Sequence, residues 1–179
     1  MAGIALLATI LAGGSEPRAA VAQPEPTLEY QVKAAFLYQF LNFVEWPTTA
    51  PGIADGMIIG VLGETALTSA LQPVAARPFR GRPLVIRPLR GPRDLAAVHV
   101  LFIAGSEKER LPGILRTTRG ASILTIGEVD GFTRLGGVIN FVIVDGKVAF
   151  EINVRAAEEA RLRISSKLLR LARIVEEKD

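Results

Sequence analysis

The chain has 179 residues, of which 49% are hydrophobic and 22% charged, and it contains no cysteine. A chain of this length and composition can build one hydrophobic core, which excludes a largely disordered protein. The formal net charge is only +3, and the lack of cysteine excludes disulfide bonds and an acylated N-terminal cysteine.

The first residues have the features of a secretory signal peptide. An apolar run at 4–11 precedes the small residues Ala20, Val21 and Ala22, so we expect cleavage after Ala22. No Lys or Arg precedes the run, and the alternative is a short hydrophobic helix that stays on the protein. The run is too short to span a bilayer, which needs about 20 residues. We therefore predict a signal peptide at 1–22 and one domain at 23–179.

A long helix is predicted at 28–44, where apolar residues recur at helical spacing. Its apolar face is broad, so most of the helix should be buried. Glu29 and Lys33 interrupt the apolar pattern, which argues against a membrane span. Trp46-Pro47 should end the helix, because the residue before a proline avoids the helical region.

The middle of the chain alternates apolar runs with helical segments, which is typical of an α/β domain. Strands are predicted at 58–62, 84–86, 98–104 and 121–126, and helices at 65–74 and, from a capping box of Ser106 and Glu109, at 106–116. The run at 98–104 is apolar almost without a break, as in a parallel strand covered on both faces. The run at 84–86 lies between Pro83 and Pro88, which places it near an edge of the sheet.

The C-terminal third changes pattern. Two β-rich runs at 138–144 and 147–152 are joined by Asp145-Gly146, which predicts an antiparallel hairpin. Two helices are predicted after it, at 154–160 and 165–175. The fold class is therefore α/β, a single domain with a mixed, mainly parallel sheet flanked by helices, a C-terminal antiparallel hairpin and two terminal helices.

Few residues could carry catalysis. His99 is the only histidine and lies in the most apolar strand, so we predict a structural role; alone, without cysteine, it cannot complete a zinc site. The turn at 60–65 lacks the third glycine of a dinucleotide fingerprint and the lysine of a phosphate-binding loop. Four carboxylates remain for acid–base work, with no fixed spacing: Glu128, Asp130, Asp145 and Glu151. We predict no enzymatic activity and no cofactor.

Six arginines lie among prolines and glycines: Arg77, Arg80, Arg82, Arg87, Arg90 and Arg93. Only Phe79 lies among them, so the aromatic platforms that stack on nucleic-acid bases are missing, and we predict no nucleic-acid binding. The cluster is either a solvated loop or a patch for an acidic partner or an anionic envelope polymer.

A protein-binding surface is predicted near the C-terminus, where 161–165 places two apolar side chains among polar ones. The candidate partner-binding residues are Glu158, Leu162 and Ile164, since an apolar anchor inside a polar rim is the usual anatomy of an interface. The alternative is that Leu162 and Ile164 pack into the chain's own core.

Several motifs occur in the order seen in a known family. They are Val32 to Tyr38 with Phe43 to Pro47, His99 to Ile103, Phe132 with Gly136-Gly137, and Phe150 to Asn153 with Ser165 to Ala172. Together they cover nearly all of 23–179, and on them the chain resembles the YfiR-like family. Members often carry cysteines, whereas here Val98 stands where one is expected before His99, so thiol redox control is excluded.

The resemblance implies a periplasmic α/β protein without catalytic activity that can form a homodimer. It implies binding to the periplasmic domain of an inner-membrane diguanylate cyclase, with repression of cyclic-di-GMP synthesis and of biofilm formation, and release by an outer-membrane lipoprotein. Two alternatives remain open. One is a periplasmic small-ligand sensor that uses the crevice at the C-terminal ends of the parallel strands, and the other is an unrecognised enzyme.

Overall fold

The computed structural model describes residues 26–175, so the predicted signal peptide at 1–22 lies outside the described residues. The strands are β1 (Val44–Glu45), β2 (Met57–Leu62), β3 (Leu84–Leu89), β4 (Val100–Ile103), β5 (Leu124–Gly127), β6 (Ile139–Val144), β7 (Lys147–Ile152), β8 (Arg163–Ile164) and β9 (Arg173–Ile174). The helices are α1 (Leu28–Phe43), α2 (Leu67–Ala75), α3 (Leu111–Thr118), α4 (Val154–Glu159) and α5 (Ser166–Leu169), with 3₁₀ turns η1 (Pro92–Asp94) and η2 (Gly105–Arg110).

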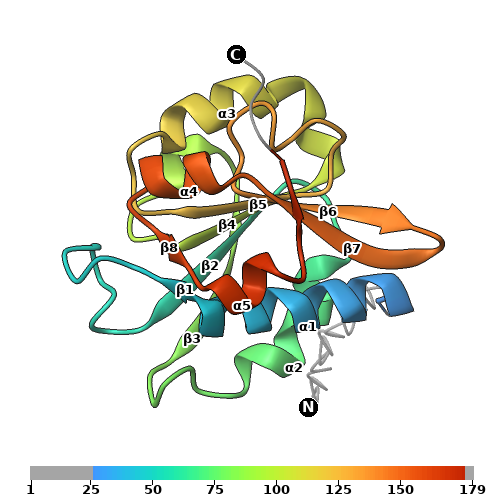
Figure 1. Cartoon of the computed structure of the whole chain (residues 1–179). Helices are drawn as coiled ribbons and strands as arrows, with labels where there is room; N and C mark the ends of the chain where they lie inside the picture. The colour runs from blue at the N-terminus through green and yellow to red at the C-terminus, as the bar shows by residue number, and fades with distance from the viewer. Residues whose placement is uncertain (1–25, 176–179) are drawn as a thin grey trace, which may run out of the picture.

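The main sheet has the strand order β3-β2-β4-β5-β6-β7-β9 (Figure 1). The first five strands in this order are mutually parallel, and β7 joins β6 as an antiparallel hairpin with β9 parallel to it. Two short strands, β1 and β8, pair separately. The predicted α/β class with a mixed, mainly parallel sheet is confirmed, and β3 lies at an edge as the flanking prolines indicated.

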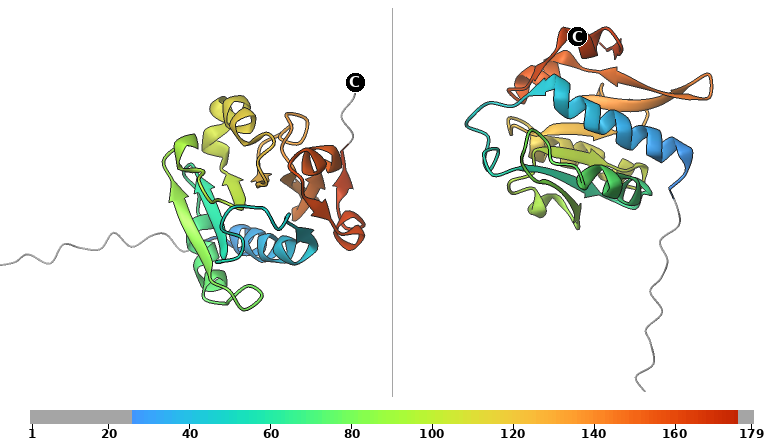
Figure 2. Two further views of the ribbon diagram at one scale, coloured as in Figure 1. Left: turned by 90° about the vertical axis from the view of Figure 1, so that its left-hand side faces the viewer. Right: turned by 90° about the horizontal axis from the view of Figure 1, so that it is seen from below.

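The core lies on both faces of the sheet, and Figure 2 shows α1 crossing one of them. On the α1 face, Phe40 packs against Phe141 and Phe150 with ring centroids 5.7 Å and 4.9 Å away. On the other face, α3 buries Leu111 and Ile114 against the alternate residues of β4. Because β4 is covered twice, all four of its residues are buried, which explains its unbroken apolar run.

The predicted capping box is wrong. The segment after β4 first forms the 3₁₀ turn η2, and α3 begins only at Leu111, followed by Pro112. The Ser106 hydroxyl does not cap this segment, because it accepts a hydrogen bond from the Glu64 N–H at 2.9 Å instead. Ser106 therefore links the β4–α3 connection to the β2–α2 connection and does not cap a helix of its own segment.

The predicted terminal helix at 165–175 is also wrong beyond its first turn. Ser165 caps the single turn α5, and the chain then extends to form β9. Arg173 and Ile174 pair with β7, and the Val175 N–H donates to the Ile152 carbonyl at 2.9 Å. The open edge of β7 offers backbone partners that helical periodicity cannot reveal. The preceding hairpin is as predicted, with positive φ at Asp145 (49°) and Gly146 (72°), typical of a type I′ turn.

Candidate partner-binding surface

His99 is buried, and both of its ring nitrogens are engaged, in agreement with the predicted structural role. Nδ1 accepts from the Ile58 N–H at 3.1 Å, so Nε2 carries the proton and donates to the Pro51 carbonyl at 3.0 Å. Trp46 Nε1 donates to the His99 carbonyl at 3.2 Å. The neutral ring thus ties the loop after β1 to β2 and β4.

We expect this histidine to make the fold sensitive to mild acid. Burial lowers the pKa of His99 below its ordinary value of 6.5, and the weaker opposing contribution is the hydrogen bond to Pro51. The unfolded chain therefore takes up the proton first, so the His99 contribution to stability is complete above pH 6.5 and is lost as the pH falls through the folded pKa. Thermal melts should show a lower Tm at about pH 5 than at about pH 7.

His99→Asn is the matched variant, because its side-chain oxygen can still accept from Ile58 but does not titrate. The fall in Tm between these two pH values should be smaller in His99→Asn than in the parent. An equal fall in both proteins would show that other groups cause the acid sensitivity.

The turn at 60–65 is closed by packing rather than open for a phosphate. Gly63 has φ +93°, and a Cβ at this position would lie 2.6 Å from Ser106 Oγ and 2.8 Å from Glu107 Cγ. The crevice between the ends of β2 and β4 is therefore filled by side chains of η2. This is the strand-order reversal where doubly wound sheets usually bind ligands.

The four carboxylates considered for acid–base work have separate environments. Glu128 binds Lys33 Nζ at 2.7 Å, and Asp145 lies in the hairpin turn. Glu151 accepts from the Thr133 hydroxyl at 3.4 Å, and Asp130 lies in the β5–β6 loop. Among residues 26–175, no group of three His, Asp or Glu side chains is placed to hold a metal ion.

The six arginines lie along the edge strand β3, three before it, Arg87 within it and two after it. Arg82 donates to the Ile53 carbonyl at 2.9 Å, and Arg87 donates to the Ala96 carbonyl at 3.2 Å. Arg80 lies over the Phe79 ring, 5.1 Å from its centroid. Three of the six therefore have local structural contacts, which favours the solvated-loop interpretation over one continuous patch.

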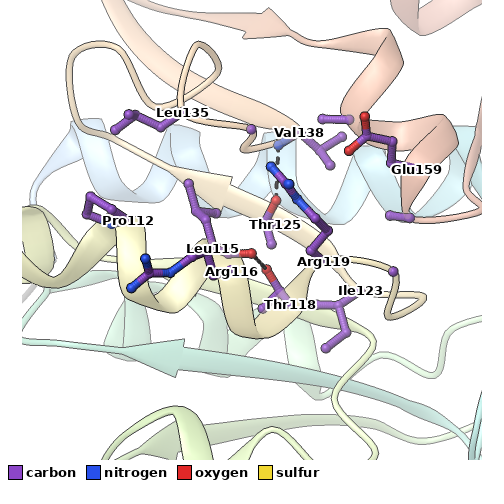
Figure 3. Close-up of a pocket in the computed structure, with 14 residues that line it drawn as sticks. Pro112, Leu115, Arg116, Thr118, Arg119, Ile123, Thr125, Leu135, Val138 and Glu159 are labelled. Carbon is purple, nitrogen blue, oxygen red and sulfur yellow. Dashed lines mark hydrogen bonds between the residues drawn. The ribbon is translucent and has the colours of Figure 1, made fainter.

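One hollow lies between α3, β5 and α4 (Figure 3). Its volume is about 190 Å³, below the ~300–1,000 Å³ usual for small-molecule sites. The polar groups on its floor are satisfied, because the Thr118 hydroxyl donates to Leu115 and Thr125 Oγ1 accepts from the Val138 N–H. The two threonines on the floor of this hollow are therefore already engaged within the chain.

The three predicted partner-binding residues differ in burial, and two of them, Glu158 and Leu162, line one groove while Ile164 does not. Glu158 is exposed on α4, whereas Leu162 is buried in the core at 2% exposure. Ile164 is half-buried, pairs with Val44 in the β1–β8 ladder and packs against the core. Leu162 is thus part of the core beneath this surface and cannot be an exposed anchor. A charge at Ile164 should lower stability as well as binding.

The same region contains a groove that the sequence did not reveal. We call it the Trp46 groove; it has a volume of about 590 Å³ and is lined by Glu45, Trp46, Pro47, Thr48, Glu158, Arg161, Leu162 and Arg163. Glu45 and Arg163 are partners in the β1–β8 ladder, so their exposed side chains share one face. A half-buried tryptophan between exposed arginines has the composition of a binding hot spot. Two of its lining residues, Glu158 and Leu162, were predicted from the sequence, whereas the residues of β1 and the loop after it were not.

Arg161 enters this groove from a strained position. The Leu162 N–H donates to the Ala157 carbonyl and the Arg161 N–H to Glu158, which is the Schellman ending of α4. Arg161 occupies the left-handed position of this motif, with φ +57°, where glycine is usual. An exposed arginine is kept here at a conformational cost.

Two solved structures show the same fold at low identity. A conserved domain protein of Vibrio cholerae O1 biovar El Tor is 15% identical with a TM-score of 0.57. The ABC domain in complex with L-Trp from Streptococcus pneumonia is 11% identical with a TM-score of 0.54. Each match covers 82% of this chain and 60% of the other, so this chain spans less than two thirds of either length. No curated protein sequence matches the chain.

The last two observations concern the helices of the chain and the family that it matches. No helix within residues 26–175 has the length and apolar character needed to cross a membrane. The YfiR/HmsC-like family, which is known for periplasmic regulators, matches residues 30–173, most of the chain. The protein belongs to the YfiR/HmsC-like family.

Proposed function

We propose that this protein is a non-enzymatic periplasmic regulator that binds the periplasmic domain of an inner-membrane diguanylate cyclase and represses it. Cyclic-di-GMP signalling and biofilm formation fall as a result. Family membership supports the regulatory role. An outer-membrane lipoprotein that sequesters the protein, and a homodimeric state, belong to the same proposal.

The Trp46 groove is the observation on which the proposal rests. It combines an aromatic wall with exposed charges of both signs, Glu45 and Glu158 against Arg161 and Arg163. Such a surface is suited to a protein partner with complementary charges, and its rim should control the association rate and salt dependence. Repression requires that the groove bind the inactive cyclase conformation more tightly than the active one.

Charge reversal in the groove tests this proposal. Arg163→Glu should weaken binding to the purified periplasmic domain of the cyclase at least tenfold, about 1.4 kcal/mol, as measured by calorimetry. It should also raise cyclic-di-GMP synthesis by membranes that contain the cyclase. The control is Arg116→Glu, at another exposed position, on α3, which should bind like the parent. Equal binding by both variants would remove the groove from the interface, and absence of binding by the parent would reject the repressor function.

Arg161→Gly separates stability from binding. Glycine is unstrained at φ +57°, so the variant should be more stable by about 1 kcal/mol in urea unfolding. The same change removes a guanidinium from the groove, so partner binding should weaken. A variant that is both more stable and fully able to bind would show that Arg161 makes no contact with the partner.

A further inference from the structure

Asn140, whose buried side-chain oxygen has no hydrogen-bond partner, lines a second pocket of about 500 Å³. Asn140 on β6 is 1% exposed, and its Oδ1 accepts no hydrogen bond. Asn153, which is 2% exposed, has both ends of its carboxamide engaged, with Thr133 and with Ala156 at 2.9 Å. Buried acceptors are normally satisfied, so the orphan oxygen of Asn140 requires an explanation.

The floor of this pocket offers a second acceptor beside the first. Asn140 and Glu151 are directly opposite in the β6–β7 ladder, so their side chains lie on the same face of the sheet. Glu151 has only long contacts, 3.4 Å to the Thr133 hydroxyl and 3.6 Å to Arg173 Nη1. An amide oxygen and a loosely held carboxylate thus lie side by side, both short of hydrogen-bond donors.

The rim makes the pocket nearly neutral overall. Asp130 and Glu151 are offset by Arg134 and Arg173, and the Arg173 side chain is 76% exposed. Arg173 can therefore move into solvent at little cost and leave Glu151 to another donor. The pocket shares no lining residue with the Trp46 groove.

We propose that this pocket binds a small molecule through a primary ammonium group. An ammonium presents three donors and one positive charge, which matches the Asn140 oxygen and the Glu151 carboxylate together. A neutral hydroxyl would satisfy Asn140 but would not replace the positive charge that Arg173 gives Glu151. The inference is independent of the repressor proposal, because it concerns different residues.

Ethanolamine and ethylene glycol are matched probes, since they differ by an ammonium in place of a hydroxyl. Ethanolamine should cause saturable NMR shifts of the backbone amides at positions 140 and 151 at millimolar concentrations, and ethylene glycol should not. Asn140→Leu and Glu151→Gln should each weaken ethanolamine binding at least tenfold. Equal responses to both probes, or no saturable response to ethanolamine, would overturn the proposal and leave an ordered water as the partner of Asn140.

Stability measurements on two leucine variants provide the second readout. Asn140→Leu removes an unsatisfied buried acceptor and should raise the Tm of the free protein by about 3 °C. Asn153→Leu removes a satisfied carboxamide of equal burial and should lower the Tm. If Asn140→Leu lowers the Tm as well, Asn140 is a structural group and the proposal is wrong.

Discussion

Replacing Lys33 by alanine is expected to lower the free energy of unfolding by about 3–5 kcal/mol. Lys33 is 4% exposed although it lies on α1, and its Nζ is 2.7 Å from Glu128 Oε2 and 2.5 Å from Glu29 Oε1. The ammonium also lies 4.7 Å from the centroid of the Tyr30 ring. Removing it leaves the carboxylate of Glu128, whose side chain is 10% exposed, without its counter-ion at the end of β5.

The loss of unfolding free energy in Lys33→Ala should have its full size at neutral pH. Burial lowers the pKa of Lys33, but the hydrogen bonds to Glu128 and Glu29 and the attraction of their charges together outweigh it, so the folded pKa lies above 10.5. The contribution of Lys33 to stability is therefore complete below the unfolded pKa of 10.5 and is lost only as the pH rises through the higher folded value. Urea unfolding near neutral pH measures the whole effect.

Two further variants separate charge from packing. Lys33→Met keeps most of the apolar stem but not the charge, and should be nearly as destabilised as Lys33→Ala. Lys167→Ala removes an exposed lysine and should change the free energy of unfolding by no more than about 0.5 kcal/mol. If Lys33→Ala behaved like Lys167→Ala, the ion pair would not hold α1 to the sheet.

The elements that the sequence predicts correctly are those with local causes. The helix at 28–43, the doubly covered strand β4 and the hairpin around Asp145-Gly146 follow from periodicity, an unbroken apolar run and turn chemistry. The predicted helix at 165–175 fails because the edge of β7 competes for its backbone. Nothing within that segment signals a partner strand some twenty residues away.

The candidate site depends even more on distant residues. The Trp46 groove exists because β1 pairs with β8, which brings Trp46 beside Arg161 and Arg163 across most of the chain. From sequence, Leu162 and Ile164 could be core or surface, and only their burial decides between these interpretations. The unsatisfied Asn140 is likewise invisible until its surroundings are known.

The second large effect is predicted at two glycines that contact the Phe132 ring, Gly127 at the end of β5 and Gly137 before β6. Phe132 is fully buried, and a Cβ at either Gly127 or Gly137 would overlap its ring, so the ring lies between two glycine backbones. Gly137→Ala should therefore lower the free energy of unfolding by about 3 kcal/mol, the upper range for an overpacked core.

The helical Gly113 is the matched control, because a Cβ there meets nothing within 4 Å. Gly113→Ala in α3 should raise the free energy of unfolding by about 0.5–1 kcal/mol, since alanine favours helix. A smaller side chain at position 132 should relieve the overlap. Phe132→Leu combined with Gly137→Ala should therefore lower the free energy of unfolding by less than the sum of the two single changes. Additive costs in chemical denaturation would show that alanine at 137 acts through something other than the Phe132 ring.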